Sequence, residues 1–156
     1  MPTSESVLGL MEQDARALHE LSESALLVEL GRRIRLADHE IAHASVLTAS
    51  AQVGLTPASE ALAGPMDFFR NAGRAFLNRF NRQMYLLCCD ASDPDHVKVK
   101  SALDLGADAA AAAIGALLIG VFGWLPGIAS VIAMIVVKRF SGGIHGAICD
   151  AWKKEL

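Results

Sequence analysis

The sequence has little net charge and few cysteines, and both shortages exclude classes of protein. The formal net charge is −3 at pH 7, whereas a domain that binds nucleic acid usually carries a clear excess of lysine and arginine. This argues against nucleic acid as a partner. The three cysteines, Cys88, Cys89 and Cys149, are odd in number and lack the spacing of a disulfide framework or a zinc knuckle. We therefore expect free thiols in a reducing cytosol.

Strands and the common catalytic motifs are also missing from the sequence. It contains no G-x-S-x-G elbow, no P-loop and no dinucleotide-binding glycine pattern. It does not begin with a basic stretch followed by an apolar core, so we expect no cleaved signal peptide. Residues 97–100 alternate as a strand does, but they follow the helix-start pattern Asp93-Pro94-Asp95. We expect a helix there and an all-α protein, with no enzymatic activity and no cofactor.

Amphipathic helices account for the first part of the chain. Apolar residues recur every three or four positions over residues 6–22 and 24–52, which is the spacing of helices that bury one face. Thr56-Pro57 has the pattern of a helix start, and Gly64-Pro65 interrupts that helix. The sequence thus predicts a small helical bundle. Its predicted segments are an amphipathic helical region over 1–92, a hydrophobic helical hairpin over 93–141 and a terminal helix over 142–156.

Residues 66–89 predict an amphipathic helix with a basic face. Phenylalanines and other apolar residues lie on one face at helical spacing. The other face carries four arginines: Arg70, Arg74, Arg79 and Arg82. Such a face suits an acidic protein partner or the headgroups of anionic lipids.

The most distinctive segment runs from Ala109 to Val137 and contains no charged residue. It exceeds the ~18 apolar residues at which a membrane span becomes the default prediction. Glycines and Pro126 interrupt the run near its centre, in a pattern that ends one helix and begins another. We therefore expect a helical hairpin with arms near 105–122 and 126–140, and with Trp124 at its tip.

The surroundings of this run are consistent with a membrane hairpin. Basic residues flank both ends, so the positive-inside rule places both ends on the cytoplasmic side of an inner membrane. Ala112, Ala116 and Gly120 form a stripe of small residues, which lets helices pack closely in lipid. The second arm is short, because about 15 residues span about 22 Å against a hydrocarbon core near 30 Å. A hairpin buried inside a soluble bundle is the alternative.

The last predicted helix, over residues 144–156, aligns Ile144, Ile148 and Trp152 on one face. Trp152 is followed by two lysines, a composition typical of helices that lie on a membrane surface. We expect an interfacial anchor, and the alternative is that Trp152 packs into a protein groove.

The letters HEIAH at residues 39–43 match the H-E-x-x-H pattern of zinc peptidases. In that interpretation His39 and His43 bind zinc, Glu40 is the general base and Glu60 supplies the third ligand. No strand precedes the motif to align a peptide substrate, and three arginines on the same helix add positive charge where a cation would bind. We therefore expect no metal site, and a zinc hydrolase is a secondary hypothesis.

In architecture, residues 94–140 resemble the hydrophobic hairpin of pore-forming colicins and the small membrane effectors of bacterial antiphage defence. The resemblance implies a protein that inserts its hairpin into the lipid of the inner membrane and permeabilises the membrane or signals there. Two helices cannot enclose a channel alone, so we expect a homo-oligomer that packs through the small-residue stripe. The alternatives are a soluble, cytoplasmic all-α interaction module whose core is the hairpin, and the zinc hydrolase.

Overall fold

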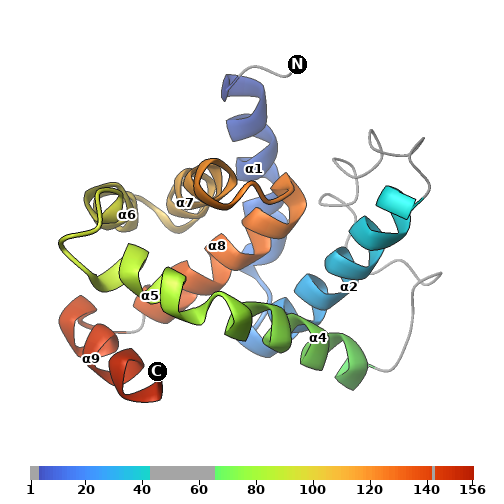
Figure 1. Ribbon diagram of the computed structural model, residues 1–156. Helices are drawn as coiled ribbons and strands as arrows, with labels where there is room; N and C mark the ends of the chain where they lie inside the picture. The colour runs from blue at the N-terminus through green and yellow to red at the C-terminus, as the bar shows by residue number, and fades with distance from the viewer. Residues whose placement is uncertain (1–3, 43–65, 142) are drawn as a thin grey trace.

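The computed structural model describes residues 4–42, 66–141 and 143–156, and within them the chain forms helices joined by short connections, without a strand. The all-α prediction is confirmed. The helices, labelled in Figure 1, are α1 (Ser4–His19), α2 (Glu23–Ala42), α4 (Met66–Arg79), α5 (Asn81–Cys89), α6 (His96–Leu103), α7 (Ala107–Phe122), α8 (Pro126–Ser141) and α9 (His145–Glu155).

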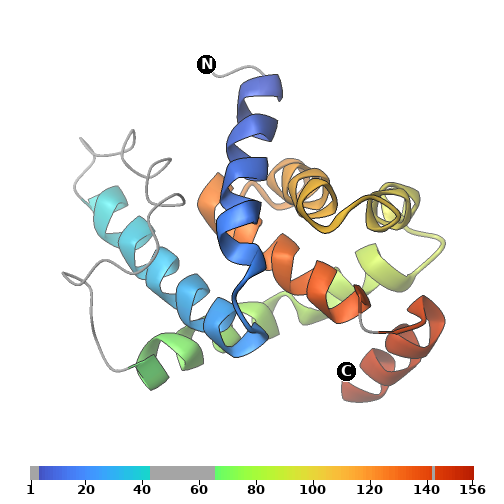
Figure 2. The ribbon, with the colours of Figure 1, turned by 180° about the vertical axis from the view of Figure 1, so that it is seen from behind.

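The helices surround α8, which runs through the middle of the bundle (Figure 1). Helices α1, α2 and α7 pack against α8, and Figure 2, which views the molecule from the opposite side, shows α1 crossing in front of α8. Helix α9 touches the end of α8 and packs against α5. One hydrophobic core extends from Met11 of α1 to Trp152 of α9, so it draws on all three segments that the sequence separates.

Helices α2 and α4 cross so closely that their backbones touch. The crossing lies at Gly31 of α2 and Gly73 of α4. A Cβ atom at Gly31 would overlap the backbone of Phe69, and one at Gly73 would overlap the carbonyl group of Leu27. Only glycine fits at these two positions without a shift of one helix, so the two glycines allow α4 to pack closely against α2.

The basic segment 66–89 is two helices, where the sequence predicts one. Phe80 separates α4 from α5, and its backbone leaves the helical region with φ −107° and ψ 10°. The amphipathic pattern continues through the break, so the pattern could not reveal it. The break places the Phe80 ring against Phe122 and Trp124 of the hairpin.

The segment 97–100 is helical, as expected, within α6. This helix begins at His96, slightly later than the Asp93-Pro94 pattern predicts, because the Asp93 carboxylate accepts a hydrogen bond from the backbone N–H of Asp95 in a turn (2.9 Å). The predicted helix at Thr56-Pro57 and the predicted extension of α2 beyond residue 42 lie outside the described residues.

The close crossing at Gly31 and Gly73 predicts that a glycine-to-alanine substitution there lowers the free energy of unfolding instead of raising it. Alanine normally stabilises a helix by about 0.5–1 kcal/mol relative to glycine. Gly73→Ala should instead destabilise the protein by about 1–3 kcal/mol, because the added methyl group forces the two backbones apart. The free energy of unfolding in urea measures the effect.

Gly9→Ala in α1 is the matched control, since a Cβ atom there would meet no atom within 4 Å. This control should be neutral or stabilising. If both alanine variants stabilised the protein equally, the close crossing would not exist in solution.

Candidate functional site

Helix α8 is apolar on all faces and is buried on all sides. Every residue from Ile128 to Val137 is buried, and several of them are completely inaccessible to solvent. A helix without a polar face is stable only where protein or lipid surrounds it. The bundle supplies that surrounding through α1, α2 and α7, so α8 is the element that the other helices enclose.

Helix α7 forms the other arm of the hairpin and packs against α1 at Gly115. A Cβ atom there would overlap the side chain of Met11. The small-residue stripe next to this contact runs from the core to the surface. Ala112 is buried, Ala116 is half-buried, and Gly120 is exposed with open space where a Cβ atom would be. The Gly120 end of the stripe therefore remains accessible in the folded bundle.

The tip of the hairpin lies at the surface of the bundle. Helix α7 ends at Gly123, which adopts the left-handed conformation (φ 69°) that glycine accommodates best. Gly123 is exposed and Val121 is 45% exposed, while Pro126, the first residue of α8, is half-buried. The predicted hairpin and its two arms are confirmed, and its turn is accessible from outside.

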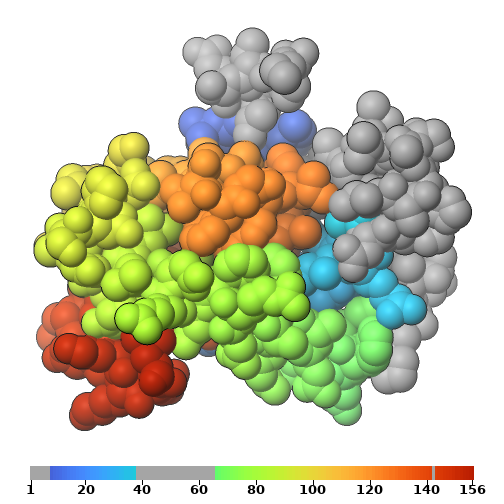
Figure 3. Space-filling model, viewed as in Figure 1, coloured from blue at the N-terminus to red at the C-terminus, as the bar shows by residue number. Residues whose placement is uncertain are grey.

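Aromatic rings connect this tip to α4 and α5. Trp124 stacks on Phe122 with 4.4 Å between ring centroids. Its indole also contacts Phe76 at 5.5 Å and Phe80 at 5.0 Å. Figure 3 shows the surface of the hairpin, in orange, beside the green surface of α4 and α5. The apolar tip and the basic helices therefore form one continuous surface.

The four predicted arginines differ in their surroundings. Arg70 is half-buried; its side chain donates a hydrogen bond to Ser24 Oγ (2.8 Å) and pairs with Asp67. Arg74, Arg79 and Arg82 are exposed. Three of the four arginines thus face solvent on the helices that contact the hairpin tip.

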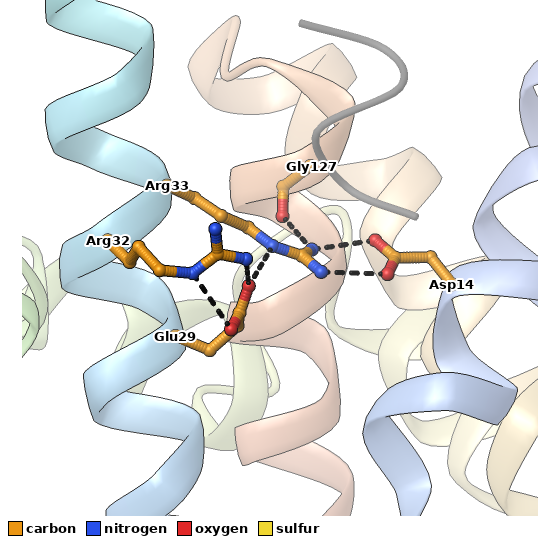
Figure 4. A network of polar contacts seen from close by, with 5 residues as sticks. All are labelled: Asp14, Glu29, Arg32, Arg33 and Gly127. Atoms are coloured by element: carbon orange, nitrogen blue, oxygen red, sulfur yellow. Dashed lines mark hydrogen bonds and ion pairs between the residues drawn. The ribbon is translucent and has the colours of Figure 1, made fainter. Parts of the chain in front are cut away.

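A network of buried charges fastens the start of α8 to α1 and α2 (Figure 4). The Arg33 guanidinium of α2 donates two hydrogen bonds to the Asp14 carboxylate of α1, at 2.7 and 3.0 Å. It also donates to Glu29 Oε1 at 3.0 Å and to the backbone carbonyl oxygen of Gly127 at 2.8 Å. Arg32 pairs with the same glutamate. All four charged side chains are at most 7% exposed.

Asp14 titrates in an unusual direction for an ion-paired carboxyl group. Burial raises the pKa of Asp14 above its ordinary value of 3.8, and the hydrogen bonds and charge of Arg33 oppose that effect. The folded protein therefore binds a proton at Asp14 more readily than the unfolded chain does. The contribution of Asp14 to the free energy of unfolding therefore increases as the pH falls from above the raised pKa towards 3.8. Protonation of Asp14 thus does not cause the protein to unfold in acid.

Trp152 lies in a groove of the protein. Its ring is 7% exposed and contacts Tyr85 of α5, with 5.8 Å between centroids, and its Nε1 donates a hydrogen bond to Asn81 Oδ1 (2.8 Å). This arrangement corresponds to the alternative in which Trp152 packs against protein. In the folded bundle, α9 does not offer this ring to a membrane surface.

Two of the cysteines are joined, so the expectation of three free thiols is wrong. Cys89 at the end of α5 and Cys149 in α9 form a disulfide between residues 60 positions apart, with 5.7 Å between the Cα atoms. Cys88 is free and buried. The pairing depends on tertiary contact between α5 and α9, and no local spacing in the sequence signals such a contact.

The structure describes the HEIAH motif only in part. The backbone of His39 and Glu40 belongs to α2, whereas His43 and Glu60 lie in the segment that is not described. Among the described residues, no group of three histidine, cysteine or acidic side chains is placed to hold a metal ion.

No protein-family model, curated protein or solved structure matches the chain. Over residues 4–42, 66–141 and 143–156, no single helix has both the length and the apolar composition needed to cross a membrane. The bent pair formed by α8 and α9, with 116° between the two helices, meets these criteria by length and composition alone.

The charge network predicts that Arg33 is among the most important polar residues for stability. Arg33→Met should lower the free energy of unfolding by about 3–5 kcal/mol, because it leaves the buried Asp14 carboxylate without its counter-ion. Arg16→Met, at an exposed position of α1, is the control and should change the free energy by less than about 0.5 kcal/mol. Equal stability of the two variants in urea titrations would contradict the buried network.

Proposed function

We propose that the protein stores the apolar hairpin α7–α8 inside a helical bundle and inserts it into a membrane that contains anionic lipid. The observation that supports the proposal is that the tip of the hairpin and a group of exposed arginines lie next to each other on the surface. A hairpin whose second arm is buried from Ile128 to Val137 reaches the surface at its tip. Exposed arginines occupy the two helices that contact this tip.

The arginines would make the first contact with the membrane. Anionic lipids create a negative surface potential, which attracts Arg74, Arg79 and Arg82. Binding through this face brings the hairpin tip to the headgroup region. Trp124 favours that depth because its ring is apolar and its N–H is polar. The surface that binds the lipid is thus the surface through which the hairpin would leave the bundle.

The hairpin itself carries little that opposes transfer into lipid. Helix α8 has no charged residue before Lys138 at its C-terminal end, and within its buried stretch the polar side chain that would lose a contact in the hydrocarbon is Ser130, which hydrogen-bonds Asp14. The main polar tie at its start is the hydrogen bond from Arg33 to the Gly127 carbonyl oxygen. Each arm has 16 residues, hence a length of about 24 Å at 1.5 Å per residue. The bilayer would have to thin to match this length.

A pore would require several copies of the chain. Two helices enclose no channel, so permeabilisation of an inner membrane by this protein implies a homo-oligomer. Gly120 is exposed at the end of the small-residue stripe and supports close packing between copies. This proposal describes a non-enzymatic membrane effector, as the resemblance to hairpin effectors implies.

A soluble interaction module is the second candidate, because the bundle already buries α8 from Ile128 to Val137 and holds Trp152 in a groove. In that case the three exposed arginines would bind an acidic protein, and the hairpin would serve only as the core.

Flotation with lipid vesicles distinguishes the two candidates. The triple variant Arg74→Gln, Arg79→Gln, Arg82→Gln should bind anionic vesicles about 100-fold more weakly than the wild type. Each arginine near an anionic surface contributes about 1 kcal/mol to binding, so three contribute about 3 kcal/mol. Release of an encapsulated dye should decrease in parallel.

The matched control changes the same number of exposed cations elsewhere on the molecule. The variant Lys100→Gln, Lys153→Gln, Lys154→Gln has the same net charge as the triple arginine variant and should retain most of the vesicle binding. If wild-type protein neither floats with anionic vesicles nor releases dye, the membrane proposal fails and the interaction module remains.

A further inference from the structure

The disulfide between α5 and α9 lies beside a histidine. His145 Nδ1 is 3.8 Å from Cys149 Sγ, one helical turn further along α9. Its other ring nitrogen, Nε2, lies 3.0 Å from the backbone carbonyl oxygen of Cys88. A carbonyl oxygen only accepts hydrogen bonds, so Nε2 carries a proton and donates a hydrogen bond to the Cys88 carbonyl oxygen. The remaining nitrogen, Nδ1, therefore faces the disulfide sulfur.

The His145 ring is fixed in this position by its neighbours. Phe140 of α8 stacks on it, with 4.8 Å between centroids and 23° between the planes. His96 of α6 approaches it edge to face at 5.9 Å. The imidazole thus cannot swing away from Cys149 without losing both ring contacts and the hydrogen bond to Cys88.

We propose that Cys89 and Cys149 form a thiol–disulfide exchange site, in which His145 is the acid–base group for the Cys149 sulfur. The co-reactant is a small monothiol of the glutathione class. The proposal is independent of the membrane function, because it concerns the opposite end of the hairpin from the tip.

The exchange proceeds in two steps, in which bonds, electrons and protons balance. A thiolate of the monothiol attacks Cys89 Sγ, which belongs to the half-buried cysteine, whereas Cys149 is only 8% exposed. A new sulfur–sulfur bond forms to Cys89 while the bond to Cys149 breaks. The electron pair of the broken bond moves to Cys149 Sγ. His145 Nδ1 takes up the proton that the attacking monothiol loses as it ionises, and the imidazolium then donates a hydrogen bond or that proton to Cys149 Sγ.

A second monothiol molecule then attacks the mixed disulfide at the sulfur of the first. Cys89 leaves as a thiolate and takes up a proton, and the two monothiols are released as their own disulfide. The protein gains two electrons and two protons, and the monothiols lose them. In the reverse direction the Cys149 thiolate, stabilised by a protonated His145, attacks the mixed disulfide on Cys89.

The third cysteine does not compete in this chemistry. Cys88 is fully buried, and burial raises the pKa of its thiol to about 12, with Asp93 adding to this effect and Arg139 opposing it. It therefore remains a protonated, unreactive thiol at neutral pH. The ionisable groups that interact around the site include His96, Cys88, Arg139, Asp93 and Asp90, and the pH profile of the test includes their influence.

The test uses the full-length protein in a glutathione redox buffer, with the thiols alkylated and identified by mass spectrometry. We expect a reversible two-electron transition that converts Cys89 and Cys149 together, in the wild type and equally in Cys88→Ser. If glutathione does not reduce the disulfide while the helices remain folded, the pair is purely structural and the proposal fails.

The role of His145 is tested by the pH profile of alkylation of reduced Cys149. In the wild type the reaction should persist at a pH where an ordinary thiol, with a pKa of about 8.5, is protonated. His145→Phe keeps an aromatic ring against Phe140 but removes both nitrogens. This variant should move the midpoint of the profile upward by about one pH unit and slow alkylation about tenfold near neutral pH.

Two results would overturn the proposed role. One is a wild-type midpoint in the range of an ordinary thiol, which needs no variant and so does not depend on how well His145→Phe folds. The other is an identical midpoint in wild type and variant, which would make His145 a packing residue only.

Discussion

The structure depends on the fact that α8 has no polar face. A helix of this kind must be enclosed on every side, and each neighbouring helix supplies one part of the enclosure. Helices α1, α2 and α7 pack along it, and α9 touches its C-terminal end. The amphipathic character of α1, α2 and α4 follows from the same requirement, since each offers an apolar face to the core and a polar face to solvent. The same composition also makes α8 compatible with lipid.

Specific contacts between helices hold the enclosure together. Arg33 ties α2 to α1 through Asp14 and to the start of α8 through the Gly127 carbonyl oxygen. The glycine crossing brings α4 against α2, and the Cys89–Cys149 disulfide ties α9 to α5. A buried ion network is costly to form and more costly to break on one side only, so it favours one arrangement of the helices over others. These contacts fasten the start of α8 within the bundle, and α9 to α5 near the other end.

Sequence patterns predict the local structure well because they record local constraints. The charge-free run, together with Gly123 and Pro126, predicts both arms of the hairpin close to their observed limits. What the sequence does not reveal depends on contacts between distant residues. Asp14 and Arg33 are 19 positions apart on different helices. Gly31 and Gly73 look like ordinary helix glycines until the two backbones meet.

The candidate site likewise contains residues that the sequence predicts and residues whose positions depend on tertiary contacts. Arg74, Arg79 and Arg82 follow from helical periodicity, and the structure leaves them exposed. The contact of Trp124 with α4 and α5 could not be predicted, because it requires the helix break at Phe80, which the amphipathic pattern crosses without interruption. His145 and Cys149 stand four positions apart in α9, but the disulfide partner Cys89 is 60 positions from Cys149, so the sequence does not show that His145 lies beside a disulfide.

The most direct test of the account is to identify what surrounds α8 before and after the protein binds a membrane. A photoreactive aliphatic diazirine residue in place of Ile132, which is fully buried, would react with whatever encloses the helix. Without vesicles the account predicts adducts within the chain, on the neighbouring helices. With anionic vesicles it predicts adducts on lipid acyl chains. Adducts within the chain in both conditions, from protein that is bound to the vesicles, would contradict insertion of the hairpin.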